Sequence, residues 1–127
     1  MKYLRLWVPA IIWMSLIFLF STQESVQVSE EQILNFLFFK TLHVIEYGIL
    51  FLLYVRATKN SLVSFFLTII YEITDEIHQT FIPSREGRLR DVIIDTVGAS
   101  ITWYFLIHVL PKMPKRLRKW AIDWQIT

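Results

Sequence analysis

The run LWVPAIIWMSLIFLF, residues 6–20, contains no charged side chain and comes close to the length that a helix needs to cross the hydrocarbon core of a bilayer. Because a short basic start precedes it, a cleaved secretory signal is the alternative interpretation. A signal should end in small residues, whereas this run stays bulky up to Phe20. Three more apolar runs follow, for which a secreted soluble domain would have no use. We therefore expect residues 6–20 to remain in the protein as its first membrane helix.

The composition of the whole chain is typical of a membrane protein. Apolar residues make up 54% of its 127 residues and aromatic residues 16%, which is well above the proportions of a soluble fold. The length suits a single domain. No cysteine is present, which excludes a disulfide framework, a thiolate metal site and a thiol nucleophile.

Hydropathy predicts four membrane helices, each near the roughly 20 residues that cross a bilayer: 5–21, 41–56, 61–80 and 91–110. The expected fold class is therefore an all-α, membrane-spanning bundle of about four helices. We assign residues 1–111 to this transmembrane domain and residues 112–127 to a basic cytoplasmic juxtamembrane tail.

The start of the second helix depends on a capping box, in which Ser29 is the N-cap and Gln32 the third helical residue. A helix from Ser29 to Arg56 would measure about 40 Å at about 1.5 Å per residue. It must then tilt, protrude from the bilayer core, or break near Lys40.

Basic residues indicate the side of the membrane. They precede the first predicted helix, separate the second from the third and follow the fourth, at Lys2, Arg5, Arg56, Lys59, Lys112, Lys115, Arg116, Arg118 and Lys119. The positive-inside rule makes these segments, and with them both termini, cytoplasmic. Segments 21–40 and 81–90 then face outward, although the second of them is itself basic. We expect the basic tail to contact anionic lipid and no nucleic acid.

Ionisable side chains are costly inside a membrane, and here they gather on three of the predicted helices. The second helix carries Lys40, His43, Glu46 and Tyr47, the third Glu72, Asp75, Glu76, His78 and Gln79, and the fourth Asp91 and Asp95. Spacings of three and four residues place most of each set on one helix face. All three sets fall in the outward half of the bundle, where Arg85 of the connecting loop could cover them. On the fourth helix Gly98 permits close helix approach.

A purely structural network is the alternative to a functional site. Ion pairs such as Lys40 with Glu76, or Arg85 with Asp91, would then hold the helices together. Adhesion alone, however, needs only Ser, Thr and small residues, so we favour a site. An ion or proton pathway is a third interpretation, which the few polar groups in the inner halves of the helices disfavour.

The polar segments resemble the VanZ-like family of small bacterial membrane proteins. The resemblance rests on KTLHVIEY at 40–47, YEITDEIHQTFIPSR at 71–85 and DVIIDTVGA at 91–99. It implies a multi-pass protein of the bacterial inner (cell) membrane whose polar pocket faces outward, and the founding member is associated with reduced susceptibility to the glycopeptide teicoplanin. Where many family members have Asn, this chain has Asp95, which adds a negative charge. The resemblance implies no settled reaction.

Two functions fit the predicted pocket. In the first, it binds a lipid-linked cell-envelope molecule or an amphiphile such as a glycopeptide antibiotic at the outer leaflet, through Lys40, Glu46, Tyr47, Gln79, Arg85 and Asp95. In the second, it is a hydrolase or transferase acting on a lipid phosphate, with the candidate catalytic residues His43, Asp75, Glu76, His78 and Asp91. A divalent cation is a candidate cofactor with no assigned ligands. The sequence leaves a homo-oligomer open.

Overall fold

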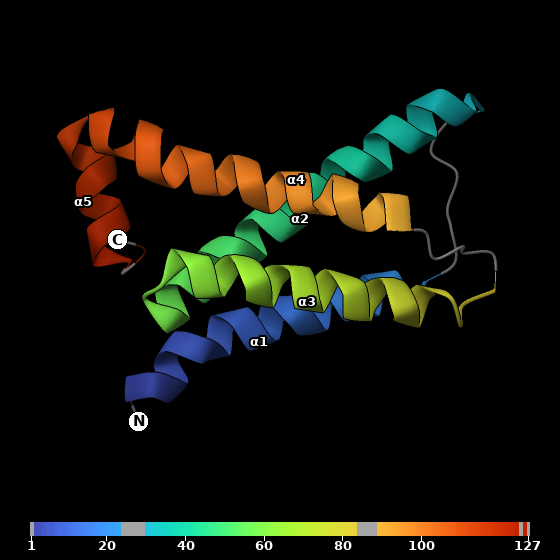
Figure 1. Ribbon diagram of the computed structural model, residues 1–127, viewed down its shortest axis with the longest axis horizontal. Helices are drawn as coiled ribbons and strands as arrows, with labels where there is room; N and C mark the ends of the chain where they lie inside the picture. The colour runs from blue at the N-terminus through green and yellow to red at the C-terminus, as the bar shows by residue number, and fades with distance from the viewer. Residues whose placement is uncertain (1, 24–29, 84–88, 125, 127) are drawn as a thin grey trace.

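The computed structural model describes residues 2–23, 30–83, 89–124 and 126, and in these residues it contains helices and no strand. The main helices are α1 (Lys2–Ser21), α2 (Gln32–Thr58), α3 (Ser61–Gln79), α4 (Leu89–Tyr104) and α5 (Lys115–Asp123). A π-helical turn, Phe105–Val109, and a 3-10 turn, Leu110–Lys112, continue α4 toward α5. Helices α1 to α4 run alternately up and down the bundle, and α5 turns across the end at which α1 begins (Figure 1).

Three of the helical stretches are long and apolar enough to cross a membrane: Tyr3–Ser21, Gln32–Thr58 and Arg90–Lys112. The remaining predicted span, α3, has 19 residues, but three of them are the acids Glu72, Asp75 and Glu76. These acids lie on the face of α3 that is buried within the bundle. The predicted all-α bundle of about four membrane helices is therefore confirmed as a fold, and α3 is its polar member.

Helix α2 is continuous through Lys40, so of the three alternatives for this long helix a break is wrong. Its N-terminal part extends past the other helices (Figure 1) and exposes apolar side chains such as Ile33. The predicted cap is also wrong: Glu31 is the N-cap and makes no side-chain cap hydrogen bond. The extended backbone of Glu31, with φ −84° and ψ 117°, interrupts the helix that a cap at Ser29 would require. Ser29 itself lies outside the described residues.

A tight turn joins α2 to α3 and sets the two helices antiparallel. Lys59 adopts a left-handed conformation with φ 59° at the end of α2. Asn60 then caps α3, because its side-chain oxygen accepts a hydrogen bond of 3.0 Å from the backbone N–H of Val63. This turn brings the polar end of α3 alongside the first half of α2.

Small residues let α2 and α4 cross closely. A Cβ atom added to Gly98 of α4 would overlap the backbone of Val44, and one added to Gly48 of α2 would lie 2.6 Å from Oγ1 of Thr102. The expected close approach at Gly98 is thus confirmed. It draws the polar faces of the two helices together.

The C-terminal residues fold back onto the bundle. The guanidinium of Arg56 donates from Nε to the carbonyl oxygen of Trp124 at 3.2 Å and lies 5.5 Å from the centre of that indole ring. Ile126 is buried in an apolar cluster with Phe51 and Val55. Helix α5 is therefore held against the bundle by specific contacts.

A candidate polar site between three helices

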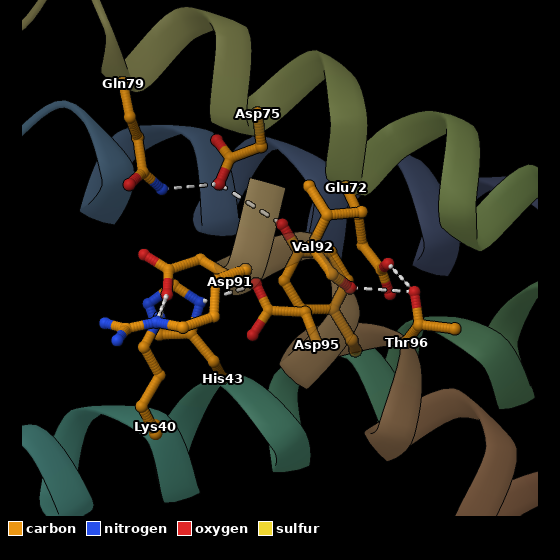
Figure 2. Close-up of polar contacts among 11 residues, drawn as sticks. Lys40, His43, Glu72, Asp75, Gln79, Asp91, Val92, Asp95 and Thr96 are labelled. Carbon is orange, nitrogen blue, oxygen red and sulfur yellow. Dashed lines mark hydrogen bonds and ion pairs between the residues drawn. The ribbon is translucent and has the colours of Figure 1, made fainter. Parts of the chain in front are cut away.

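Polar side chains of α2, α3 and α4 meet in the half of the bundle opposite the start of α1 (Figure 2). They form what we call the polar cluster: Lys40, His43, Tyr47, Glu72, Asp75, Gln79, Asp91, Asp95 and Thr96. Each helix contributes one face, as the spacing of three and four residues predicts. Residues that the sequence assigned to three separate helices thus lie together in the structure.

Two ion pairs between α2 and α4 lie at the edge of the polar cluster. Nζ of Lys40 is 2.9 Å from Oδ1 of Asp91, and each side chain is 17% exposed. Nδ1 of His43 is 3.3 Å from Oδ2 of Asp95. The Lys40–Asp91 separation is that of a charge-assisted contact between an ammonium and a carboxylate. Both contacts therefore link α2 to α4 through acidic and basic side chains.

Asp75 of α3 is the centre of a second set of contacts, deeper in the bundle. It is 3% exposed, and its Oδ2 accepts hydrogen bonds from the Tyr47 hydroxyl at 3.2 Å and from Nε2 of Gln79 at 3.0 Å. Its other oxygen, Oδ1, is buried without a hydrogen-bond partner. Two donors on one oxygen suit an ionised carboxylate.

Glu72 joins α3 to α4 through Thr96, whose hydroxyl oxygen lies 2.8 Å from Oε2 of Glu72. The sequence pattern placed Glu72 on the polar stripe without giving it a role, and it missed Thr96 altogether. A helical threonine usually bonds to its own backbone, so its type carries no signal of a contact with another helix. Its position next to Asp95 was the only indication available.

Several predicted site residues lie apart from these contacts. His78 stacks on Phe18 of α1, with ring centres 4.1 Å apart, and so faces a different helix from the polar cluster. Glu76 is buried on α3, and Lys40, which a purely structural network could have paired with Glu76, pairs with Asp91. The backbone carbonyl of Glu46 accepts a hydrogen bond of 3.0 Å from Nε1 of Trp13 on α1. Arg85, and its expected pair with Asp91, lie outside the described residues.

The sequence model of the VanZ/LLP1 family matches residues 6–110. This chain belongs to the VanZ/LLP1 family. The match covers α1 to α4 with the whole polar cluster and ends before α5. Comparison with curated proteins and with solved structures gives no significant match. The family resemblance seen in the sequence is therefore confirmed.

The donor set of this VanZ/LLP1 site does not fit the divalent cation that was a candidate cofactor. Within residues 2–23, 30–83, 89–124 and 126, no three His, Asp or Glu side chains converge as metal ligands would. The carboxylates of the polar cluster instead contact side chains of other types, namely Lys40, His43, Tyr47, Gln79 and Thr96. The arrangement can hold charge at its edge and exchange protons within, because it combines an imidazole, a phenol and several carboxyl groups.

Proposed function

We propose that this VanZ/LLP1 protein binds an amphiphilic or lipid-linked molecule of the cell envelope at the polar cluster, from the outer leaflet of the bacterial cell membrane. Its effect would be to lower susceptibility to lipoglycopeptides of the teicoplanin type. The observation that carries the proposal is the partly exposed Lys40–Asp91 pair at the edge of a buried polar cluster.

The Lys40 ammonium is the proposed anchor for an anionic headgroup. It is paired with Asp91 at 2.9 Å, and each side chain of the pair is 17% exposed. A phosphate or carboxylate of a ligand offers the ammonium the same kind of charge-assisted contact as the Asp91 carboxylate. Arg90, whose Nε lies 3.9 Å from the same Asp91 oxygen, adds a second positive charge at this edge.

Apolar surface for a lipid tail lies next to this anchor. Phe36 and Leu37 stand about one helical turn before Lys40 on α2 and are 42% and 54% exposed. Phe36 also faces the Arg90 guanidinium, which lies 5.4 Å from its ring centre. A molecule with a charged head and an acyl tail matches this combination, whereas a small soluble ion would use only the anchor.

The orientation of the bundle supports access from outside. The polar cluster lies at the end opposite α5 and the start of α1 (Figure 1). The start of α1, the junction between α2 and α3, and the segment from Lys112 to the end of α5 together carry nine of the 13 Lys and Arg residues. The positive-inside rule assigns the basic end to the cytoplasm, so the polar cluster would face the outer leaflet.

The test measures teicoplanin susceptibility and the binding of labelled teicoplanin to cells with and without the protein. We expect the protein to reduce the killing, and Lys40→Met to abolish that protection at normal membrane levels. A glycopeptide without a lipid tail is the control, and its effect should not change. Unchanged teicoplanin binding and susceptibility in cells that contain the protein would rule the proposal out.

One observation favours a second candidate, a membrane-embedded hydrolase or transferase acting on a lipid phosphate. His43 is paired with Asp95, and a carboxylate that orients an imidazole is the usual arrangement of a general base. Release of phosphate from lipid phosphates by the purified protein, lost in His43→Gln, would support this function. No release by the wild type would contradict it.

A further inference from the structure

Glu72 is the most deeply buried acid of the polar cluster. Its side chain is 1% exposed and lies on the face of α3 that packs within the bundle. The ion pairs among the described residues involve Asp91 and Asp95 and do not include Glu72. Its Oε1 is buried without a hydrogen-bond partner, and its Oε2 has a single neighbour, the hydroxyl of Thr96. An ionised carboxylate so placed would lack the donors that a buried charge needs.

The Thr96 hydroxyl has only one hydrogen to donate, and two oxygens lie at the same distance from it. Thr96 Oγ1 is 2.8 Å from Oε2 of Glu72 and 2.8 Å from the carbonyl oxygen of Val92, one turn earlier on α4. A carbonyl oxygen can only accept. If Thr96 donates to Val92, the hydrogen between Thr96 and Glu72 must come from Glu72.

Other helical threonines show which oxygen takes the Thr96 hydrogen. Four of them, away from the helix ends, donate to the carbonyl four residues earlier at 2.8 or 2.9 Å, namely Thr41, Thr68, Thr74 and Thr102. Thr96 has the same geometry toward Val92. Its hydrogen is therefore used within α4, and its oxygen, which also faces Glu72 (Figure 2), has a lone pair left to accept.

Neighbouring charges act in the same direction. Asp75 on α3 and Asp95 on α4 are both buried acids of the same cluster; Asp75 accepts hydrogen bonds from Tyr47 and Gln79, and Asp95 lies 3.3 Å from Nδ1 of His43. A third negative charge among them would be repelled. Helix α1, which also packs on α3, has no ionisable side chain in residues 6–20.

We infer that Glu72 holds a proton and donates it to Thr96, so that these two residues form a buried proton-binding site inside the bundle. The ligand of this site is a proton, and its position is set by helix packing. The inference does not depend on which molecule binds at Lys40 and Asp91. It gives the polar cluster a neutral acid that can release a proton when the surrounding charges change.

Infrared spectroscopy of the full-length protein in detergent at neutral pH tests this inference. The wild type should show the carbonyl stretching band of a protonated carboxyl group, and Glu72→Gln should lack it. The matched control, Asp75→Asn, should keep the band. Thr96→Val, which removes the acceptor, should shift the band, whereas Thr96→Ser should leave it in place.

A second measurement keeps the test independent of the folding of these variants. Wild-type protein labelled with ¹³C at the glutamate carboxyl groups should show the band at lower frequency, because the heavier carbon slows the vibration. Absence of the band in the wild type, a band that the label does not move, or a band that survives in Glu72→Gln would each overturn the inference.

Discussion

The backbone of Val44 on α2 occupies the space that a side chain at Gly98 on α4 would need. This contact sets how closely the two helices cross, and the Lys40–Asp91 and His43–Asp95 pairs are both formed between the same two helices. The geometry of the polar cluster is therefore coupled to one glycine.

Gly98→Ala should destabilise the bundle by about 1–3 kcal/mol, because the added methyl group must push the two backbones apart. Thermal unfolding in detergent, followed by circular dichroism, measures this change. Gly48→Ala is the matched control: it meets the side chain of Thr102, which can rotate, so it should cost less. Equal stability of Gly98→Ala and wild type would show that the helices cross less closely than described.

Tyr47→Phe should lower the free energy of unfolding by about 1–3 kcal/mol, since it removes one of the two donors to the buried Asp75 oxygen. A double-mutant cycle with Asp75→Asn isolates this contact. We expect a coupling energy between the two substitutions. Additive effects would mean that the hydroxyl and the carboxylate do not interact.

The Lys40–Asp91 pair separates a structural role of the polar cluster from a binding role. Lys40→Met and Asp91→Asn should each destabilise the protein by about 1–2 kcal/mol, between a surface pair and a fully buried one, because a partly buried charge loses its partner. The double variant should regain stability and normal membrane levels, which quantitative immunoblotting measures.

Activity of that double variant then decides between the two roles. If the pair only holds α2 to α4, teicoplanin protection should return together with stability. If Lys40 contacts a ligand, protection should stay lost although the protein accumulates normally. Four contacts of the polar cluster join different helices, as a structural network requires: Lys40–Asp91, His43–Asp95, Tyr47–Asp75 and Glu72–Thr96. The double variant therefore needs both measurements, stability and protection.

Helical periodicity was sufficient to predict most of the residues that share the polar cluster, although not Thr96. Lys40, His43 and Tyr47 recur at three- and four-residue spacing, and that spacing fixes a common face whatever the neighbouring helix does. Hydropathy predicted the four helices α1 to α4 in the same local way. The face of a helix on which a residue lies and the apolar length of a helix depend only on residues close in the sequence. Both can therefore be predicted from a single sequence.

Partner choice within the polar cluster could not be predicted, because it depends on the angles at which helices cross. Lys40 meets Asp91 and not Glu76, since the contact of Gly98 with Val44 brings α4 closer to this part of α2. His78 lies at the edge of the polar face of α3, where its ring stacks on Phe18 of α1. The role of Thr96 likewise depends on a glutamate 24 residues away in the sequence.

Arg56 ties the C-terminal segment to the bundle, which gives a last prediction. Its guanidinium donates to the Trp124 carbonyl at 3.2 Å and to the Arg5 carbonyl at 3.4 Å, and it stacks over the Trp124 ring. Arg56→Ala should release α5 with a loss of about 1 kcal/mol or less in global stability, because the α1–α4 core is unchanged.

A spin label on α5 measures this release, and the absence of natural cysteines makes single-site labelling simple. With the label at Ile122→Cys, whose side chain is exposed, Arg56→Ala should raise its mobility in electron paramagnetic resonance spectra. Arg56→Lys is the informative comparison, because it keeps the charge but lacks the planar fork that reaches two carbonyls and stacks on the indole. We expect Arg56→Lys to resemble the alanine variant more than the wild type; a lysine variant with wild-type mobility would show that charge alone holds α5 in place.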